Sequence, residues 1–239
     1  MAAESKSATK PRKGTRGLDR EMVIQAALQS IDLQGAQGLT MRGLGKELGV
    51  EAMSLYHYAT GREDVLEGVV ALLLQDVPKQ LSGELCQSWQ GYLQALAHAI
   101  RKVAVEHPLA FPLVATRHPA APWLRPPLRS LEIVEHFLGT LEGFAFSEDQ
   151  TARTYRSFSS FLLGHLLLEA TMRGAETSPI EEPLDEGEAT VPNGDGDLVL
   201  PPDSPLLRFR SKLSEDHEAE EFEAALETLL ERIEMEISQ

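Results

Sequence analysis

Cysteine and long hydrophobic runs are nearly absent from this chain of 239 residues. The single cysteine, Cys86, cannot form an internal disulfide, which is typical of a protein kept in a reducing compartment. The longest uncharged apolar run, Val69 to Leu74, is far too short to span a bilayer. Residues 2–20 are polar and basic, whereas a secretory signal would be hydrophobic. We therefore expect a cytoplasmic protein with no membrane partner.

The motifs of common enzyme classes are also missing. The sequence has no Walker loop, no glycine-rich dinucleotide loop, no nucleophile elbow and no cysteine cluster. Two pairs, Glu132 with His136 and His165 with Glu169, have the i, i+4 spacing of metal ligands on a helix. A di-iron bundle needs paired Glu-x-x-His motifs on facing helices, and none is present. We predict no enzymatic activity, no catalytic residue, no metal and no cofactor.

Strand-like alternation of apolar and polar residues is hard to find in this sequence. Alanine and aliphatic residues dominate instead, and they recur at helical spacing. We therefore predict an all-α fold, and a chain of this length holds one large or two small domains with a buried core.

The charge is segregated along the chain. The net charge of −15 argues at first against a nucleic-acid partner. Residues 1–62, however, carry 9 Lys and Arg against 6 Asp and Glu, a net charge of +3, whereas residues 63–239 carry 13 against 31, a net charge of −18. The basic N-terminal part can approach DNA, and the acidic remainder should limit non-specific binding.

The stretch from Thr40 to Arg62, TMRGLGKELGVEAMSLYHYATGR, has the pattern of two short helices joined by a tight turn at Gly49. Leu44 and Leu48 lie four residues apart on the inner face of the first helix, and Leu55 points inward from the second. The other side chains of the second helix are small, hydroxyl-bearing or aromatic, and none is acidic. A helix-turn-helix places such a helix in the major groove, where these groups reach base edges and phosphates. The stretch therefore predicts a DNA-reading head.

The same stretch resembles the DNA-binding domain of the tetracycline repressor (TetR) family. The resemblance is carried by Leu39-Thr40-Met41-Arg42, by Leu48-Gly49-Val50 and by Ser54-Leu55-Tyr56-His57-Tyr58. It is tight from Asp19 to Leu74 and looser beyond. It implies an N-terminal three-helix helix-turn-helix domain followed by a larger helical domain that binds a ligand and dimerises.

The resemblance also implies which residues contact DNA. Arg42 is one of them because a guanidinium suits phosphate or guanine, and the alternative is a surface arginine paired with Glu47 or Glu51. Tyr56 and His57 have a second interpretation, packing against the first helix. Met53 stands where the tetracycline repressor has proline, and His57-Tyr58 where it has Trp-His, so the operator sequence is not carried over. The full predicted set is Thr40, Arg42, Ala52, Met53, Ser54, Tyr56, His57, Tyr58 and Arg62.

Capping signals delimit the head. Asp19 is a predicted N-cap for a first helix that ends at Gln34, and Thr40 for the second. Thr60-Gly61-Arg62-Glu63 has the spacing of a capping box, which opens a fourth helix that Pro78 ends. We expect a DNA-binding domain over residues 18–78. Residues 1–17 form a predicted disordered arm, with Lys10, Arg12, Lys13 and Arg16 as alternative phosphate contacts.

The remaining residues, 79–239, form the expected regulatory and dimerisation domain. A proline-rich stretch over residues 108–127 permits only short helical pieces. Residues 175–205 hold 9 acidic residues, 6 prolines and no Lys or Arg, so we expect a disordered acidic loop. Ser147 and Gln150 have capping-box spacing. The helices are expected at residues 88–105, 128–141, 147–173 and 218–237.

A homodimer follows from both the sequence and the resemblance. One short recognition helix reads few base pairs, whereas two related by a twofold axis read a palindrome in successive major grooves. In the family, the helices matching residues 147–173 and 218–237 pair with their copies in a four-helix interface. The predicted interface residues are the apolar ones of these helices: Tyr155, Leu162, Leu166, Phe222, Leu226, Leu229 and Ile233.

Family members typically bind a small-molecule effector in this domain, and the effector releases the DNA by a population shift. The pocket candidates are aromatic or amphipathic, and each also has core packing as an alternative: Tyr92, Phe111, Trp123, His136, Phe158 and His165. We predict a ligand-responsive DNA-binding repressor. The alternative is a helical small-molecule-binding protein or enzyme that carries the fold without binding an operator.

Overall fold

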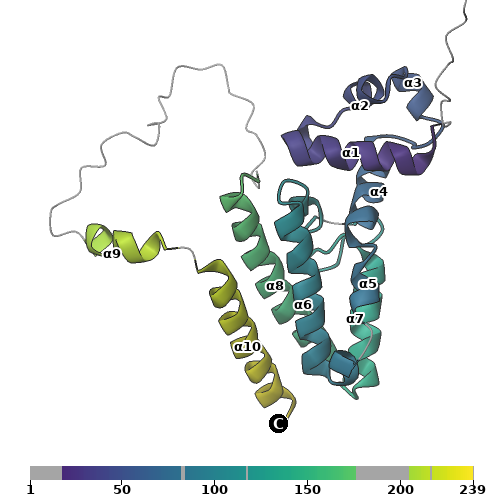
Figure 1. Cartoon of the computed structure of the whole chain (residues 1–239). Helices are drawn as coiled ribbons and strands as arrows, with labels where there is room; N and C mark the ends of the chain where they lie inside the picture. Colours follow the sequence, from purple (N-terminus) through teal and green to yellow (C-terminus); the bar gives the residue numbers. More distant parts are fainter. Residues whose placement is uncertain (1–17, 82–83, 117, 176–204, 216, 239) are drawn as a thin grey trace, which may run out of the picture. The chain divides into compact units, whose positions relative to one another are not determined.

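The computed structural model describes residues 18–81, 84–116, 118–175, 205–215 and 217–238, and every regular element in these ranges is helical (Figure 1). The chain divides into two compact units, Met1–Gln75 and Asp76–Gln239. No helix in the described ranges is long and apolar enough to cross a membrane. The predicted all-α fold is confirmed.

The first unit consists of α1 (Arg20–Gln34), the 3-10 turn η1 (Ala36–Gly38), α2 (Met41–Leu48), α3 (Ala52–Leu55) and α4 (Arg62–Leu74). Two caps are those the sequence predicts. The Asp19 carboxylate accepts a hydrogen bond from the Met22 N–H at 2.8 Å, and the Thr40 hydroxyl accepts one from the Gly43 N–H at 3.0 Å. Helices α1 and α4 pack together, and both bury apolar residues completely: Val23, Ala27, Ile31, Val65 and Val69.

Two glycines fix the turn between α2 and α3. Gly49 adopts the left-handed conformation, with φ 69°, that lets its N–H end α2 by bonding back to the carbonyls of Gly45 and Lys46. The Val50 N–H bonds to the Gly45 carbonyl at 2.9 Å. A Cβ atom at Gly45 would lie 3.0 Å from the Val50 carbonyl oxygen and 3.1 Å from the Ala52 nitrogen. The small residue therefore allows α3 to approach α2 closely.

The start of α4 differs from the prediction. The helix begins at Arg62 after Gly61, and Glu63 does not act as the reciprocal cap. Asp64 does so instead, because its carboxylate accepts hydrogen bonds from the Thr60 N–H at 2.7 Å and from the Thr60 hydroxyl at 3.3 Å. The predicted capping box of Thr60 and Glu63 is wrong by one residue.

The second unit contains α5 (Val77–Gln80), η2 (Glu84–Gln87), α6 (Trp89–Glu106), η3 (Phe111–Leu113), α7 (Leu131–Gly143), α8 (Glu148–Met172), α9 (Pro205–Leu213) and α10 (Glu218–Ile237). The fourth helix ends at Leu74, earlier than the predicted end at Pro78, and Pro78 instead lies in the first turn of the separate helix α5. The described residues between η3 and α7, 114–116 and 118–130, contain no regular helix, as the prolines predict. Helix α9 was not predicted.

Helix α8 is the central element of this unit, and it contacts α6, α7 and α10. Its N-terminus carries the predicted capping box, in which Ser147 and Gln150 satisfy each other's backbone N–H groups. Phe158 on α8 and Phe137 on α7 are buried with ring centroids 5.7 Å apart, and Tyr155 lies 5.5 Å from Phe137. Because aromatic rings bury large areas, this cluster anchors α7 on α8.

Two expectations lie outside the described residues. They concern the basic arm over residues 1–17 and almost all of the acidic loop, residues 176–204.

Candidate DNA-binding surface and regulatory unit

Of the six predicted contact residues in α3 and the turns after it, three are exposed and three are half-buried. Leu55 is completely buried, whereas Met53 is 72% exposed, Tyr56 is 48% exposed and His57 is exposed. Ala52, Ser54 and Tyr58 are half-buried. The exposed His57 does not pack into the core, so that alternative is wrong.

Regular α-helix ends at Leu55, and the next three residues continue only as turns. Tyr56, His57 and Tyr58 donate their N–H groups to the carbonyls three residues earlier, at 3.3, 3.4 and 2.9 Å. Within the described ranges, the side chains of Ser54, Tyr56, His57 and Tyr58 form no hydrogen bond, so their polar groups stay available to a partner.

Arg42 has the same character. Its side chain is exposed on α2, and no ion pair or hydrogen bond joins it to a residue that the structure describes. Glu47, one of the two carboxylates considered as its partner, instead accepts a hydrogen bond from the Ser30 hydroxyl at 3.1 Å. Thr40 is exposed beside Arg42, although its hydroxyl serves as the α2 cap. The pairing of Arg42 with Glu47 is thus wrong.

Arg62 has structural contacts that the sequence did not predict. Its Nε donates to the Leu39 carbonyl at 2.9 Å, and a terminal nitrogen donates to the Ala36 carbonyl at 2.7 Å. These bonds tie the start of α4 to the turn before α2. These two bonds give Arg62 a structural role and leave fewer of its N–H groups for a phosphate.

Sequence reasoning missed a second arginine in this unit. Arg20 on α1 forms a two-pronged ion pair with Asp64, at 2.6 and 3.2 Å, and also donates to the Tyr58 carbonyl at 2.7 Å. The hydrogen bond from Arg20, together with that from the Thr60 N–H, lowers the pKa of Asp64 from 3.8 to about 2. Arg20 and Asp64 are 44 residues apart, so no local pattern could have revealed the pair.

The six predicted pocket residues do not form one group. Tyr92, Phe111 and Phe158 are buried in the core, as their alternative interpretation required. The Tyr92 hydroxyl lies 3.0 Å from His136 Nδ1, and burial raises the pKa of Tyr92. Trp123 is 74% exposed on the irregular segment before α7. His165 packs elsewhere, with its ring 5.2 Å from that of Phe222.

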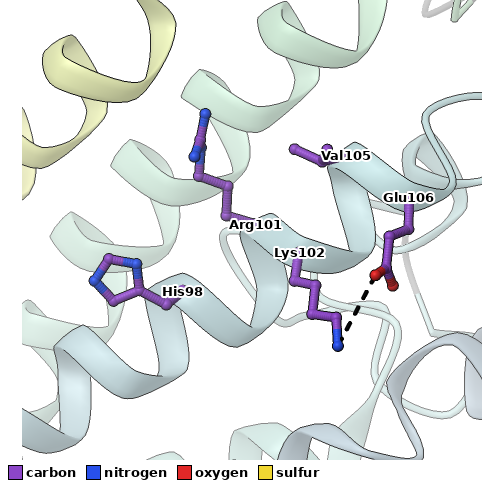
Figure 2. Close-up of a pocket in the computed structure, with 5 residues that line it drawn as sticks. All are labelled: His98, Arg101, Lys102, Val105 and Glu106. Carbon is purple, nitrogen blue, oxygen red and sulfur yellow. Dashed lines mark ion pairs between the residues drawn. The ribbon is translucent and has the colours of Figure 1, made fainter.

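A hollow of about 250 Å³ lies along α6 instead (Figure 2). Its lining residues follow a helical spacing along one face: His98, Arg101, Lys102, Val105 and Glu106. Lys102 lies 3.9 Å from Glu106, and His98 lies 3.5 Å from Glu223 on α10. Sequence reasoning did not select this face, although its i, i+3, i+4, i+7 spacing was visible.

A buried ion network joins α6, α8 and α10 at one side of this hollow. Glu169 on α8 is only 3% exposed and binds Arg101 of α6 through two hydrogen bonds, at 2.8 and 3.1 Å. Arg173 also contacts Glu169, at 3.1 Å, and continues to Glu218 of α10 at 2.7 Å. The Arg101 guanidinium lies 5.1 Å from the centre of the Phe222 ring. Glu169 is therefore a structural ion-pair residue, and no group of three or more His, Cys, Asp or Glu in the described ranges could hold a metal.

The predicted dimer residues also need correction. Six of the seven are buried within the single chain, namely Tyr155, Leu162, Leu166, Phe222, Leu226 and Ile233, and only Leu229 is half-buried. Residues that are already packed inside one subunit leave little surface for a second one. The apolar periodicity identified the inner face of α8 and α10, whereas an interface needs the outer face.

Comparison with known proteins agrees with the division into a helix-turn-helix unit and a larger helical unit. Residues 23–69 match the model of bacterial regulatory proteins of the tetR family, and residues 83–237 match the tetracyclin repressor-like C-terminal domain. The tetracycline repressor protein class D of Escherichia coli is 27% identical over 227 residues, covering 92% of this chain and 91% of that protein.

Solved structures show the same fold. A possible TetR family transcriptional regulator from Streptomyces coelicolor A3(2) superposes with a TM-score of 0.69 at 25% identity, over 91% of this chain and 99% of that one. The Streptomyces coelicolor protein ActR, solved in complex with actinorhodin, superposes with a TM-score of 0.66 at 18% identity, over 93% of this chain and 99% of that one. The two family models together span both structural units. The chain therefore belongs to the TetR family of bacterial transcriptional regulators, and it is a regulator rather than an enzyme.

Proposed function

We propose that this protein is a repressor that binds a palindromic operator as a homodimer and is released by a small-molecule effector. The observation that carries the proposal is the α2–α3 surface. There Arg42, Tyr56 and His57 are exposed and have no partner in the described ranges, on a helix-turn-helix with a closely packed turn. Groups of this kind bind phosphates and base edges. A repressor acts on the chromosome, so we place the protein in the cytoplasm.

The contacts divide into two kinds. Arg42 and the Tyr56 hydroxyl suit phosphates, and Arg42 also suits the two acceptors of guanine. Ala52, Met53 and Ser54, at the start of α3, are the residues that enter the groove first in a helix-turn-helix, so we assign them to base edges. We assign Thr40, His57 and Tyr58 to the edge of the same surface, where Thr40 and His57 are exposed and Tyr58 is half-buried. Arg62 is left out of the contact set because two backbone carbonyls hold it.

We propose that the dimer forms through the outer face of α8. Between Ser157 and Met172 the only charged residue is the buried Glu169, so the exposed face of this long segment carries no charge. Leu168 is 69% exposed and Met172 is 75% exposed. The exposed residues recur at three- or four-residue spacing and include small ones that let helices approach closely: Ser157, Ser160, Gly164, Leu168 and Met172. Such a stripe matches helix pairing in a four-helix bundle.

Substituting Leu168 tests the dimer. Leu168→Glu places a carboxylate in the proposed interface and should convert the dimer to a monomer at micromolar concentration, as measured by analytical ultracentrifugation. Leu33→Glu is the matched control, because Leu33 is an exposed leucine on α1, outside this face. A dimer that survives Leu168→Glu unchanged would remove α8 from the interface.

The effector is an organic molecule whose identity is open. A related fold, ActR, was solved with actinorhodin. To release the DNA, a ligand must bind the conformation that does not bind DNA more tightly than it binds the DNA-bound conformation. We assign Tyr92, His136 and Phe158 to the lining of the effector site in the second unit. The Tyr92 ring stacks on His136, and Phe137 links Tyr92 to Phe158.

Fluorescence anisotropy tests the proposed function. The full chain is titrated onto DNA from the region flanking its own gene and onto a scrambled duplex, at two salt concentrations. Specific binding that weakens with salt would support the repressor and would provide an assay for releasing ligands. If neither duplex binds, selection from random duplexes follows, and failure to enrich any sequence would contradict the proposal.

A further inference from the structure

The reading segment, residues 52–58, ends at Tyr58, whose carbonyl is bound by Arg20. Regular α3 has only four residues, and the turns after it contain no α-helical bond until the Ala59 N–H reaches the Leu55 carbonyl at 3.0 Å. The direction of the Tyr56 and His57 side chains therefore depends on what fixes the backbone at Tyr58. In the described structure the Tyr58 carbonyl accepts a hydrogen bond from Arg20, at 2.7 Å.

Asp64 orients the arginine that makes this contact. One carboxylate oxygen accepts from Arg20 at 2.6 Å, and the other accepts from Arg20 at 3.2 Å and from the Thr60 N–H at 2.7 Å. The pair thus binds the backbone on both sides of Ala59, which is itself buried. The far end of the helix-turn-helix is held in a similar manner, since Arg62 binds the carbonyls of Ala36 and Leu39.

We propose that Arg20, oriented by Asp64, is a positioning residue for operator reading, which sets the direction of Tyr56 and His57 through the Tyr58 carbonyl and does not itself bind phosphate. This inference rests on the proposed function of the α2–α3 surface. Its physical basis is that a planar guanidinium can hold a carboxylate with two parallel bonds while a further N–H reaches a carbonyl.

The charge of Arg20 is also compensated locally. The ionised Asp64 carboxylate lies against it, and the low pKa of Asp64 keeps that carboxylate charged at neutral pH. A phosphate ligand contributes to affinity by releasing counterions, and an arginine already neutralised by a carboxylate contributes little to that release. A positioning residue and a phosphate ligand therefore differ in their effect on the salt dependence of binding.

The test uses the full chain and two probes: a duplex that the wild-type protein selects from a random pool, and a scrambled duplex. Arg20→Gln and Asp64→Asn should each weaken binding to the selected duplex by about tenfold, because each breaks the same hold on the segment. The double variant should be no weaker than either single variant. Binding to the scrambled duplex and the salt slope should stay unchanged for the double variant, because it removes both charges of the pair and keeps the net charge.

Arg20→Lys separates geometry from charge. Lysine keeps the positive charge but cannot form the two parallel bonds, so this variant should resemble Arg20→Gln. Arg232→Gln is the matched control, because Arg232 forms an exposed ion pair with Glu236 on α10, in the other unit. Retained binding to the scrambled duplex, together with an unchanged circular dichroism spectrum, shows that a variant is folded.

Several outcomes would overturn the inference. If Arg20→Gln lowers the salt slope by about one while Arg20→Lys behaves as wild type, Arg20 is a phosphate ligand. If Asp64→Asn tightens binding, the carboxylate only repels DNA. If all variants select and bind as wild type does, Arg20 has no role in reading. A wild-type protein that selects no sequence would instead refute the proposed function before any variant is made.

Discussion

Charged and polar groups have opposite environments on the proposed DNA-reading surface of α2 and α3, called the reading surface below, and at the junction of α6, α8 and α10. On the reading surface, Arg42, Tyr56 and His57 are exposed and form no hydrogen bond, ion pair or ring contact with described residues. At the junction, Glu169 is almost fully buried and is bound by two arginines. A group without an internal partner costs nothing while water solvates it, and it remains available to a ligand. A buried charge must be paired inside the protein, because its desolvation is otherwise uncompensated.

The comparison predicts that substitutions at the junction change stability, whereas substitutions on the reading surface change DNA binding only. The first two predictions below each test one side of it, and the third concerns the exposed pair of Arg20 and Asp64.

The largest effect is expected at Glu169. Glu169→Gln removes the charge that Arg101 and Arg173 share, and Arg101 is itself mostly buried. Breaking a buried pair by neutralising one partner should cost about 3 kcal/mol of unfolding free energy. Urea denaturation followed by circular dichroism measures this cost. Glu142→Gln is the matched control, because Glu142 is exposed on α7. Equal stability of the two variants would show that the network does not hold the junction.

Arg42 and Tyr56 should give the next largest effect. The double variant Arg42→Ala with Tyr56→Phe removes a guanidinium and a hydroxyl, and it should weaken binding to the selected duplex by about 100-fold, or roughly 3 kcal/mol. The midpoint of urea unfolding should not move, since neither side chain has a partner in the described structure. Tight binding by this variant would refute the assigned reading surface.

The smallest effect concerns Asp64 and pH. The pKa of Asp64 is lowered in the folded state to about 2 from 3.8, so the ionised form is favoured by folding. The resulting stability is fully present above pH 4 and is lost as the pH falls from about 4 to about 2. Because the pair with Arg20 is largely exposed, we expect less than about 1 kcal/mol. Acid titration of wild type and Asp64→Asn should show the two stabilities converging over this window. A constant difference down to pH 2 would contradict the assigned partner.

Local sequence signals predicted the elements of the molecule well. The caps at Asp19, Thr40 and Ser147 and the turn at Gly49 depend on atoms within four residues of one another, so a linear pattern contains them. The same holds for the inward direction of Leu44 and Leu55. Helix α9 was missed because its nine residues follow the acidic stretch and give only a short apolar pattern.

Partner choice between distant residues could not be predicted. Arg62 was expected at a phosphate because it begins a helix, but two carbonyls more than 20 residues earlier in the sequence take its donors. The apolar residues of α8 and α10 were expected between subunits, but six of them are buried in one. Apolar spacing shows which face of a helix is buried. It does not show whether the same chain or a second subunit covers that face.

The sequence by itself determined the all-helical fold, the helix-turn-helix with the exposed side chains of Arg42, Tyr56 and His57, and membership of the family. These depend on periodicity, caps and motif spacing, which are local properties of the chain. Only the tertiary structure decided that Arg20 and Arg62 hold backbone carbonyls, that Glu169 is a buried ion-pair residue and that the uncharged face of α8 is exposed. The physical reason is that a hydrogen bond or an ion pair depends on distance in space, and folding brings together groups as far apart as Arg101 and Glu169.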